Sequence, residues 1–197
     1  MANYLCIFSA PDPHIRFLAA NPEALWNYVD GQRPDPPTPK KPVILDKLFG
    51  RSSGPAPTTE IPHDWPTDEA RMIGPEINHR NVDLYHRILN GGEEFVSGAG
   101  TIFQTWLTPR DHGAIAIGGD GETFAFTSEI IPSLQQLVSC VDPVRVNEQY
   151  LAWLQKEGKN HVPGAEECEE FAKEFADLSQ ELQAVVAAGN GIIWISS

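Results

Sequence analysis

Residues 165–195 read AEECEEFAKEFADLSQELQAVVAAGNGIIWI, and the spacing of apolar residues changes within this stretch. Up to residue 188 an apolar side chain recurs every three or four positions, at Cys168, Phe171, Phe175, Leu178, Leu182 and Val185. This period predicts an amphipathic helix from about 165 to 188. The Gly-Asn-Gly at 189–191 is a typical helix stop. The apolar run 192–195 then predicts a terminal strand over 191–196, buried on both faces at the centre of a sheet.

The segments before this stretch predict further helices and strands. Strand-like composition marks residues 3–9 and 101–127, the latter a small antiparallel unit turned at Gly118–Gly121. Residues 128–188 are predicted to be mainly helical. Shorter helices are expected after Asp12 and over 22–28, 41–49 and 83–89. We interpret Asp12 as the N-cap of the first, and we expect Trp26 to face inward from the second. The order of strands and helices indicates the α+β class.

Prolines are concentrated near the start of the chain. Of the 17 prolines, 13 lie within residues 1–75, mostly in tracts inside residues 30–75. Proline lacks the backbone N–H that helices and sheets require, so these tracts predict long loops. The segments between them are too short for cores of their own. We therefore predict one domain over residues 1–197, with a small, mostly antiparallel sheet packed against several helices.

The net charge is the most informative number in the composition. The chain has 27 acidic and 14 basic side chains, a formal charge of −13. Such a surface repels phosphate backbones, so nucleic-acid binding is not expected. No apolar run approaches the roughly 20 residues of a membrane span. The first residues lack the basic segment of a secretory signal, which predicts a cytoplasmic protein.

The common catalytic and metal-binding motifs are absent. The sequence contains no HExxH, GxSxG or GxxxxGK[ST] pattern. Its three cysteines, Cys6, Cys140 and Cys168, are widely separated and fit neither a disulfide framework nor a zinc site. We therefore expect no catalytic residue, no metal and no cofactor.

The predicted helix over 165–188 carries a row of acidic side chains. These are Glu166, Glu167, Glu169, Glu170, Glu174, Asp177 and Glu181, with Lys173 as the one base among them. The simplest interpretation is a solvated helix face, since early acids also favour the helix dipole. The functional interpretation is a docking surface for a basic protein. Trp65 lies in a proline-rich connection and is a candidate interface anchor.

Histidines near carboxylates offer an alternative pocket. His86 falls on the predicted helix over 83–89, and Asp111 and His112 fall in a loop beside Trp106. A carboxylate next to an imidazole can tune it for acid–base chemistry. Surface histidines without a catalytic role are the simpler interpretation of both sites.

Several short segments resemble the YfbM-like family of small bacterial proteins. They include Asn3-Tyr4-Leu5, Leu45-Asp46-Lys47, Ile88-Leu89-Asn90-Gly91-Gly92 and Ala188-Gly189-Asn190-Gly191 with the apolar residues that follow. Leu48-Phe49 replace a Trp-His of the family, and residues 50–80 and part of 101–120 resemble insertions. The resemblance implies a single α+β domain of bacterial origin, without an established activity.

Charge and missing motifs lead to two functional hypotheses. The first is a non-enzymatic acidic binding protein, an immunity protein that neutralises a basic toxin domain by direct binding. The comparison with other small acidic immunity proteins is an analogy. The alternative is a small hydrolase or ligand-binding enzyme with a His–carboxylate site. The sequence leaves the oligomeric state open.

Overall fold

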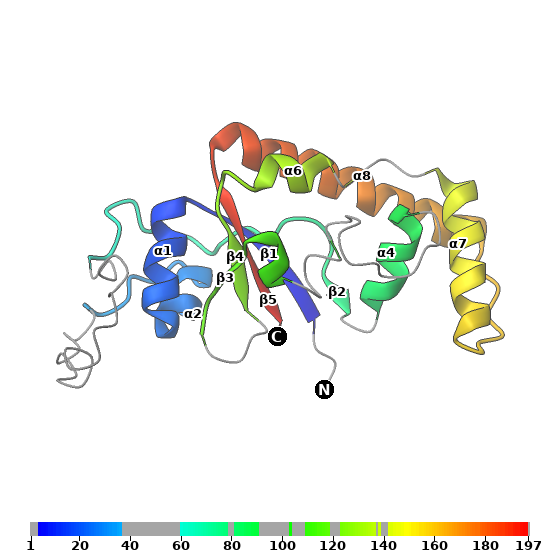
Figure 1. The fold of residues 1–197 in the computed structure, drawn as a ribbon, viewed down its shortest axis with the longest axis horizontal. Helices are drawn as coiled ribbons and strands as arrows, with labels where there is room; N and C mark the ends of the chain where they lie inside the picture. The colour runs from blue at the N-terminus through cyan, green and yellow to red at the C-terminus, as the bar shows by residue number, and fades with distance from the viewer. Residues whose placement is uncertain are drawn as a thin grey trace.

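Five antiparallel strands form the centre of the described part of the molecule (Figure 1). The computed structural model describes residues 4–36, 60–78, 81–90, 103, 109–118, 123–136, 138 and 142–196. Within them the strand order is β2-β1-β5-β4-β3. The strands are β1 (Tyr4–Ala10), β2 (Ile77–Asn78), β3 (Ile115–Ala116), β4 (Phe124–Phe126) and β5 (Gly191–Ser196). With the helices described below, this sheet confirms the α+β class.

Strand β5 is central, as its uninterrupted apolar sequence predicts. It pairs with β1 from Leu5–Ser196 to Ala10–Gly191 and with β4 from Phe124–Trp194 to Phe126–Ile192. Ile192 and Trp194 belong to one buried cluster and Ile193 and Ile195 to another. Because successive side chains of a strand point to opposite faces, both faces of β5 must be covered.

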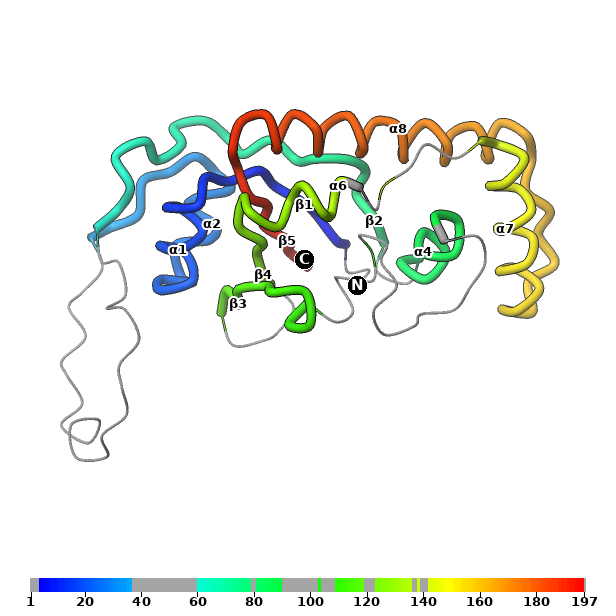
Figure 2. The backbone as a smooth tube through the Cα atoms, turned by 45° about the horizontal axis from the view of Figure 1, so that its top comes forward, coloured from blue at the N-terminus to red at the C-terminus, as the bar shows by residue number. Residues whose placement is uncertain are grey.

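Helices cover the two faces of the sheet (Figure 2). One buried cluster joins Phe8, Ala10 and Ile193 to the helices α1 (Asp12–Ala20) and α2 (Leu25–Val29), which are linked by a 3-10 turn, η1 (Pro22–Ala24). The other joins Leu5, Ile7 and Trp194 to the remaining helices. These are α4 (Val82–Asn90), α6 (Ile131–Gln136), α7 (Pro143–Lys156) and α8 (Ala165–Ala188). A second 3-10 turn, η3, spans Pro109–His112.

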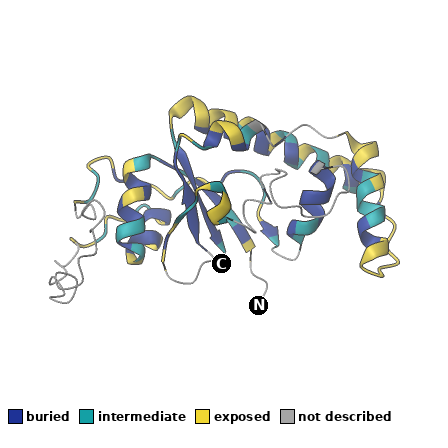
Figure 3. Cartoon of the chain, viewed as in Figure 1, coloured by how far each residue is buried: buried dark blue, intermediate teal, exposed yellow. Residues whose placement is uncertain are grey.

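Helix α8 has the bounds that the sequence predicts. Its apolar stripe is buried except for the half-buried Phe171, and its opposite side is exposed along the helix (Figure 3). Gly189 ends it with a φ of +67°, a left-handed conformation that favours glycine. Helix α8 packs against α6 and α7 and near its C-terminus meets β5. The exposed side of α8 is thereby left available along most of its length.

The described end of the proline-rich region forms a strap across β1 and α8, residues 70–75. The N–H of Ala70 donates to the carbonyl of Val29, and the N–H of Ile73 donates to that of Ile7, both at 2.7 Å. Met72 forms an isolated antiparallel bridge with Phe8. Gly74 has a φ of +67° and a backbone close to Leu178 of α8. The strap therefore runs beside α8 rather than free in solvent.

Several local expectations are wrong. Pro11 occupies the N-cap position of α1, while the carboxylate of Asp12 accepts bonds from the Ser128 backbone N–H at 2.8 Å and hydroxyl at 2.9 Å. Trp26 is 55% exposed instead of inward-facing. Its position on the short helix α2, whose buried residues are Leu25, Tyr28 and Val29, turns it outward.

Other expectations are confirmed or fall on residues outside the description. Strands β3 and β4 pair antiparallel, as predicted for 101–127, but residues 119–122 of the turn are outside the described chain. The helix expected over 41–49 also lies outside it. At the start of the unit predicted over 101–127, Phe103 is the one described residue of 101–107, and its backbone is helical instead of extended. Among the described helices none is long and apolar enough to cross a membrane.

Candidate functional site

A groove runs along the C-terminal half of α8, between that helix and the strap. Its acidic part has a volume of about 600 Å³ and is lined by Arg71, Gly74, Glu174, Asp177, Gln180 and Glu181, among others. An adjoining apolar part of about 170 Å³ is lined mainly by Ser9, Ile73, Ala184, Val185 and Ala188. Arg71, Glu181 and Ala184 line both parts. We call the two parts together the α8 groove.

The helix period explains why three acidic residues reach this groove. Glu174, Asp177 and Glu181 are spaced by three and four positions, so they lie on one side of α8. The buried stripe lies beside them, at Phe175, Leu178 and Leu182. Because the stripe fixes the rotation of α8 against the core, the acidic side chains are directed toward the strap. Arg71 is the one basic side chain among the residues that line the acidic part.

Glu181 is held in place by two contacts from the strap. Its Oε1 lies 2.6 Å from Nη2 of Arg71, and its Oε2 accepts a bond of 2.5 Å from the backbone N–H of Gly74. The Arg71 side chain is 85% exposed, whereas that of Glu181 is 27% exposed. Glu181 is therefore not a freely solvated residue, contrary to the simplest interpretation of the acidic row.

Glu174 is also engaged within the chain. Its Oε2 accepts a bond of 2.8 Å from the Tyr85 hydroxyl of α4. Burial raises the pKa of Glu174 above its usual value, the Tyr85 bond opposes this, and the negative charge of Glu170 adds to the rise. Burial, and secondarily the negative charge of Glu174, raises the pKa of Tyr85. A half-buried carboxylate of this kind is destabilised as an anion until a cation approaches it.

The N-terminal half of α8 is more open. Glu166, Glu169 and Glu170 are exposed. Glu167 is the exception, since its Oε2 lies 3.0 Å from Nε2 of His161. Burial disfavours the charge on Glu167, but hydrogen bonds from His161 and Tyr150 outweigh it and lower the pKa. The predicted acidic row therefore divides into exposed acids near the start of α8 and groove-lining acids toward its end.

Trp65 is buried and is not an exposed anchor. It is 5% exposed, and its Nε1 donates to the carbonyl of Gln32 at 2.8 Å. Its ring packs edge-on against Phe17 and Tyr28. The position of Trp65 between two prolines suggests exposure, but the loop folds back onto α1 and α2. Trp26, on the surface of α2, has the exposure that was expected of Trp65.

The sequence gives no signal for a His–carboxylate contact next to Trp65. Nε2 of His14 lies 3.0 Å from Oδ1 of Asp64, a residue 50 positions away in the chain. His14 is 2% exposed and the Asp64 side chain is 72% exposed. The hydrogen bond from His14 is the main cause of the lowered pKa of Asp64. Pairing over such a separation needs the tertiary fold, so local spacing could not reveal it.

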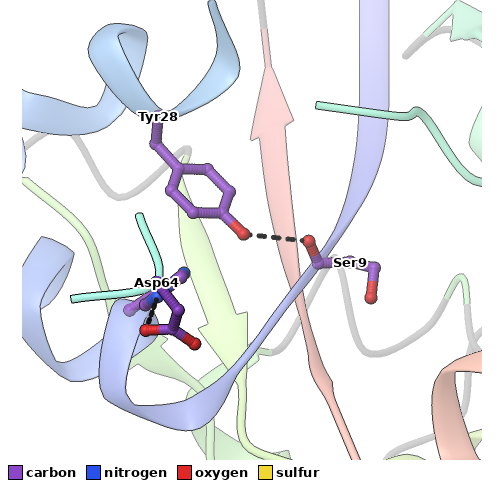
Figure 4. Close-up of polar contacts among 4 residues, drawn as sticks. Ser9, Tyr28 and Asp64 are labelled. Atoms are coloured by element: carbon purple, nitrogen blue, oxygen red, sulfur yellow. Dashed lines mark hydrogen bonds and ion pairs between the residues drawn. The ribbon is translucent and has the colours of Figure 1, made fainter. Parts of the chain in front are cut away.

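Tyr28 completes the buried surroundings of this contact (Figure 4). Its hydroxyl donates to the backbone carbonyl of Ser9 at 3.1 Å, which Figure 4 shows beside Asp64. Burial, and secondarily the charge of Asp64, raise the pKa of Tyr28. Nδ1 of His14 is buried and has no hydrogen-bond partner among the residues that the structure describes. With the ring of His14 closed off from solvent, this arrangement fastens the loop to α1 and offers little access to a substrate.

The residues of the alternative pocket have unequal surroundings. His86 is fully buried within α4. Asp111 is exposed and His112 half-buried in η3. Trp106 lies outside the described residues, so the pocket stays a prediction. Among the described residues no group of three or more His, Cys, Asp or Glu side chains is placed to hold a metal ion.

Comparisons with known proteins give one weak similarity. No family model matches the chain, and no curated protein matches its sequence. Among solved structures, YfbM from Escherichia coli, a protein of unknown function, is similar at a TM-score of 0.48 and 13% identity. The alignment covers 100% of this chain and 100% of that chain. The comparison is a weak, fold-level link to a YfbM-like protein.

Proposed function

We propose that this protein is a non-enzymatic binding protein whose α8 groove receives a basic protein partner. The observation that carries the proposal is the lining of the acidic part of the groove, where Glu174, Asp177 and Glu181 face one base, Arg71. The exposed acids Glu166 and Glu170 extend the same charge along α8. A concave surface of one sign attracts a partner of opposite sign and speeds its association.

The partner class that we propose is a basic toxin domain, neutralised by direct binding. The net charge of −13 supports a strongly basic partner, because opposite charges steer the encounter over distances beyond direct contact. A tight inhibitor also needs a pre-formed surface, and the hydrogen bond from the Gly74 backbone N–H holds the carboxylate of Glu181 in place for this. The proposal therefore combines long-range steering with a carboxylate that is already positioned.

Charge reversal tests this function. The product of the adjacent reading frame is purified and its association with this protein followed by stopped-flow fluorescence at several salt concentrations. Replacing Glu170→Lys and Asp177→Lys together should lower the association rate constant about tenfold at low salt. A matched control, Glu148→Lys with Glu157→Lys, changes the charge equally at an exposed position of α7 and at the exposed residue that caps its C-terminus. The proposal is wrong if both double variants slow association equally. It is also wrong if the protein from the adjacent reading frame is not basic or does not bind.

The alternative, a small hydrolase or ligand-binding enzyme, stays a prediction based on His86, Asp111, His112 and Trp106. Its test is a panel of hydrolase substrates with the wild-type protein and His112→Ala. Turnover that is lost in this variant would favour the enzyme over the binding protein. The geometry favours the binding protein, because the fully buried His86 is closed to a substrate.

A further inference from the structure

The centre of the α8 groove already contains a cation from the protein itself. The guanidinium of Arg71 lies at 2.6 Å from Glu181, where the acidic and apolar parts of the groove adjoin. Arg71 comes from the strap and not from α8, so it reaches across the groove. A partner's basic side chain that approached Glu181 would meet a position that Arg71 already fills.

The two members of this ion pair differ in how firmly they are held. Arg71 is 85% exposed, and an ion pair with so exposed a partner contributes little to stability. Glu181 has a second bond, from the backbone N–H of Gly74, and hydrogen bonds to a charged acceptor are among the stronger ones. Arg71 can therefore swing away at small cost while the carboxylate of Glu181 keeps its position.

The apolar part of the groove defines what should stand next to the partner's basic residue. Val185 and Ala188 lie four and seven residues after Glu181, a rise of about 6–10 Å along the helix axis. An extended chain advances about 3.3 Å per residue, so two to three residues span this distance. The matching segment carries an arginine and, about three positions away, an apolar side chain.

We propose that Arg71 is an internal competitor for the groove, and that a basic–apolar segment of the partner displaces it from Glu181. This rests on the proposed function, and adds to it the chemistry of the recognised segment and the residue that sets its affinity. A polypeptide with this pattern fits because the acidic part and the apolar part of the groove adjoin at Arg71, Glu181 and Ala184. Removal of Arg71 should therefore strengthen binding.

A labelled peptide tests the competition by fluorescence anisotropy. The probe is acetyl-Gly-Arg-Ala-Ala-Leu-Gly-amide with a terminal fluorophore, and control peptides carry Gln for Arg or Ser for Leu. Arg71→Ala should bind the probe about three- to tenfold more tightly than wild type. Arg16→Ala, which removes an exposed base from α1, is the control for the change in net charge. Glu181→Gln should lose most of the binding.

Each outcome has a defined meaning. Equal affinities of Arg71→Ala and Arg16→Ala, weaker binding by Arg71→Ala, or no binding of the probe to any variant overturn the competition. Glu181→Gln also changes the contact between Glu181 and the strap, so this variant cannot show whether Glu181 stays in place. The backbone amide signal of Gly74 is therefore followed by NMR in the wild-type protein. This signal should keep the chemical shift of a hydrogen-bonded amide when the peptide binds. A change to the shift of a free amide would show that Glu181 moves and would contradict the proposal.

The peptide test and the charge-reversal test fail separately. If the basic protein partner binds and depends on Asp177, but Arg71→Ala behaves like Arg16→Ala, the proposed function survives and the competition is wrong. If no basic protein associates with the chain, the proposed function is wrong whatever the peptide does.

Discussion

An acidic side chain of α8 that lines the groove can lower the stability of the fold, and Glu174 shows this most clearly. Its carboxylate lines the groove but is half-buried and has a raised pKa. A carboxyl group with a raised pKa binds its proton more tightly in the folded state than in the unfolded state. Folding is therefore favoured at low pH, and part of that stability is lost as pH rises from about 4.5 through the higher pKa of the folded state.

Replacing Glu174→Gln should consequently stabilise the fold at pH 7 and weaken the binding of a basic partner. The amide oxygen of glutamine still accepts the Tyr85 hydroxyl bond, while the buried charge is gone. Urea denaturation at pH 3.5 and pH 7 measures the effect, which should be near zero at the lower pH and stabilising at the higher one. Glu169→Gln, at an exposed position of the same helix, is the control. An identical pH dependence for both variants would contradict the assigned role of burial.

The individual residues of the site could be predicted from the sequence only in part. Six of the seven acidic residues of the row, all but Glu167, are either exposed on α8 or line the groove. Nothing in the sequence indicates that Arg71 and Gly74 belong to the site. They lie 110 and 107 positions from Glu181 and contact it only in the folded chain. The burial of Trp65 has no signal in the sequence for the same reason. The proline-rich composition around it describes the local backbone and not what the loop packs against.

At the scale of elements, α8 links the core to the groove. Leu182 is fully buried on the stripe that sets the rotation of α8, next to the groove-lining Glu181. Leu182→Ala should lower the free energy of unfolding by about 2–5 kcal/mol, because it leaves a cavity in a packed core. It should also weaken probe binding, since the helix loses the contact that orients its acidic side.

Chemical denaturation and peptide anisotropy measure the two effects of Leu182→Ala. Gln183→Ala, at the exposed neighbouring position, should change unfolding by less than about 0.5 kcal/mol. A Leu182→Ala protein that is as stable as the Gln183→Ala protein would show that α8 is not oriented by its buried stripe.

At the scale of the whole molecule, the sheet separates two buried clusters that must fold together. Trp65 belongs to the cluster with α1 and α2, and Trp153 and Trp194 belong to the cluster with α4, α6, α7 and α8. Both clusters use side chains of the same strands, β1 and β5. Neither cluster can lose these strands alone, so we predict one cooperative unfolding transition, as a single domain requires.

Fluorine NMR of protein labelled with 5-fluorotryptophan follows this transition at each tryptophan. The native signals of Trp65 and Trp194 should disappear at the same urea concentration. Midpoints that differ by more than the experimental error would indicate two units that unfold independently and would contradict the single domain over residues 1–197.

The sequence by itself determined the period of α8, its stop at Gly189, the central strand β5 and the acidic row, because each depends on residues that are neighbours along the chain. The α+β class followed from the order of these elements. The tertiary structure decided which acids are exposed, which line the groove, and which base faces them. Those features depend on contacts between the strap and α8, and such contacts arise only when the buried stripe and the sheet bring distant segments together.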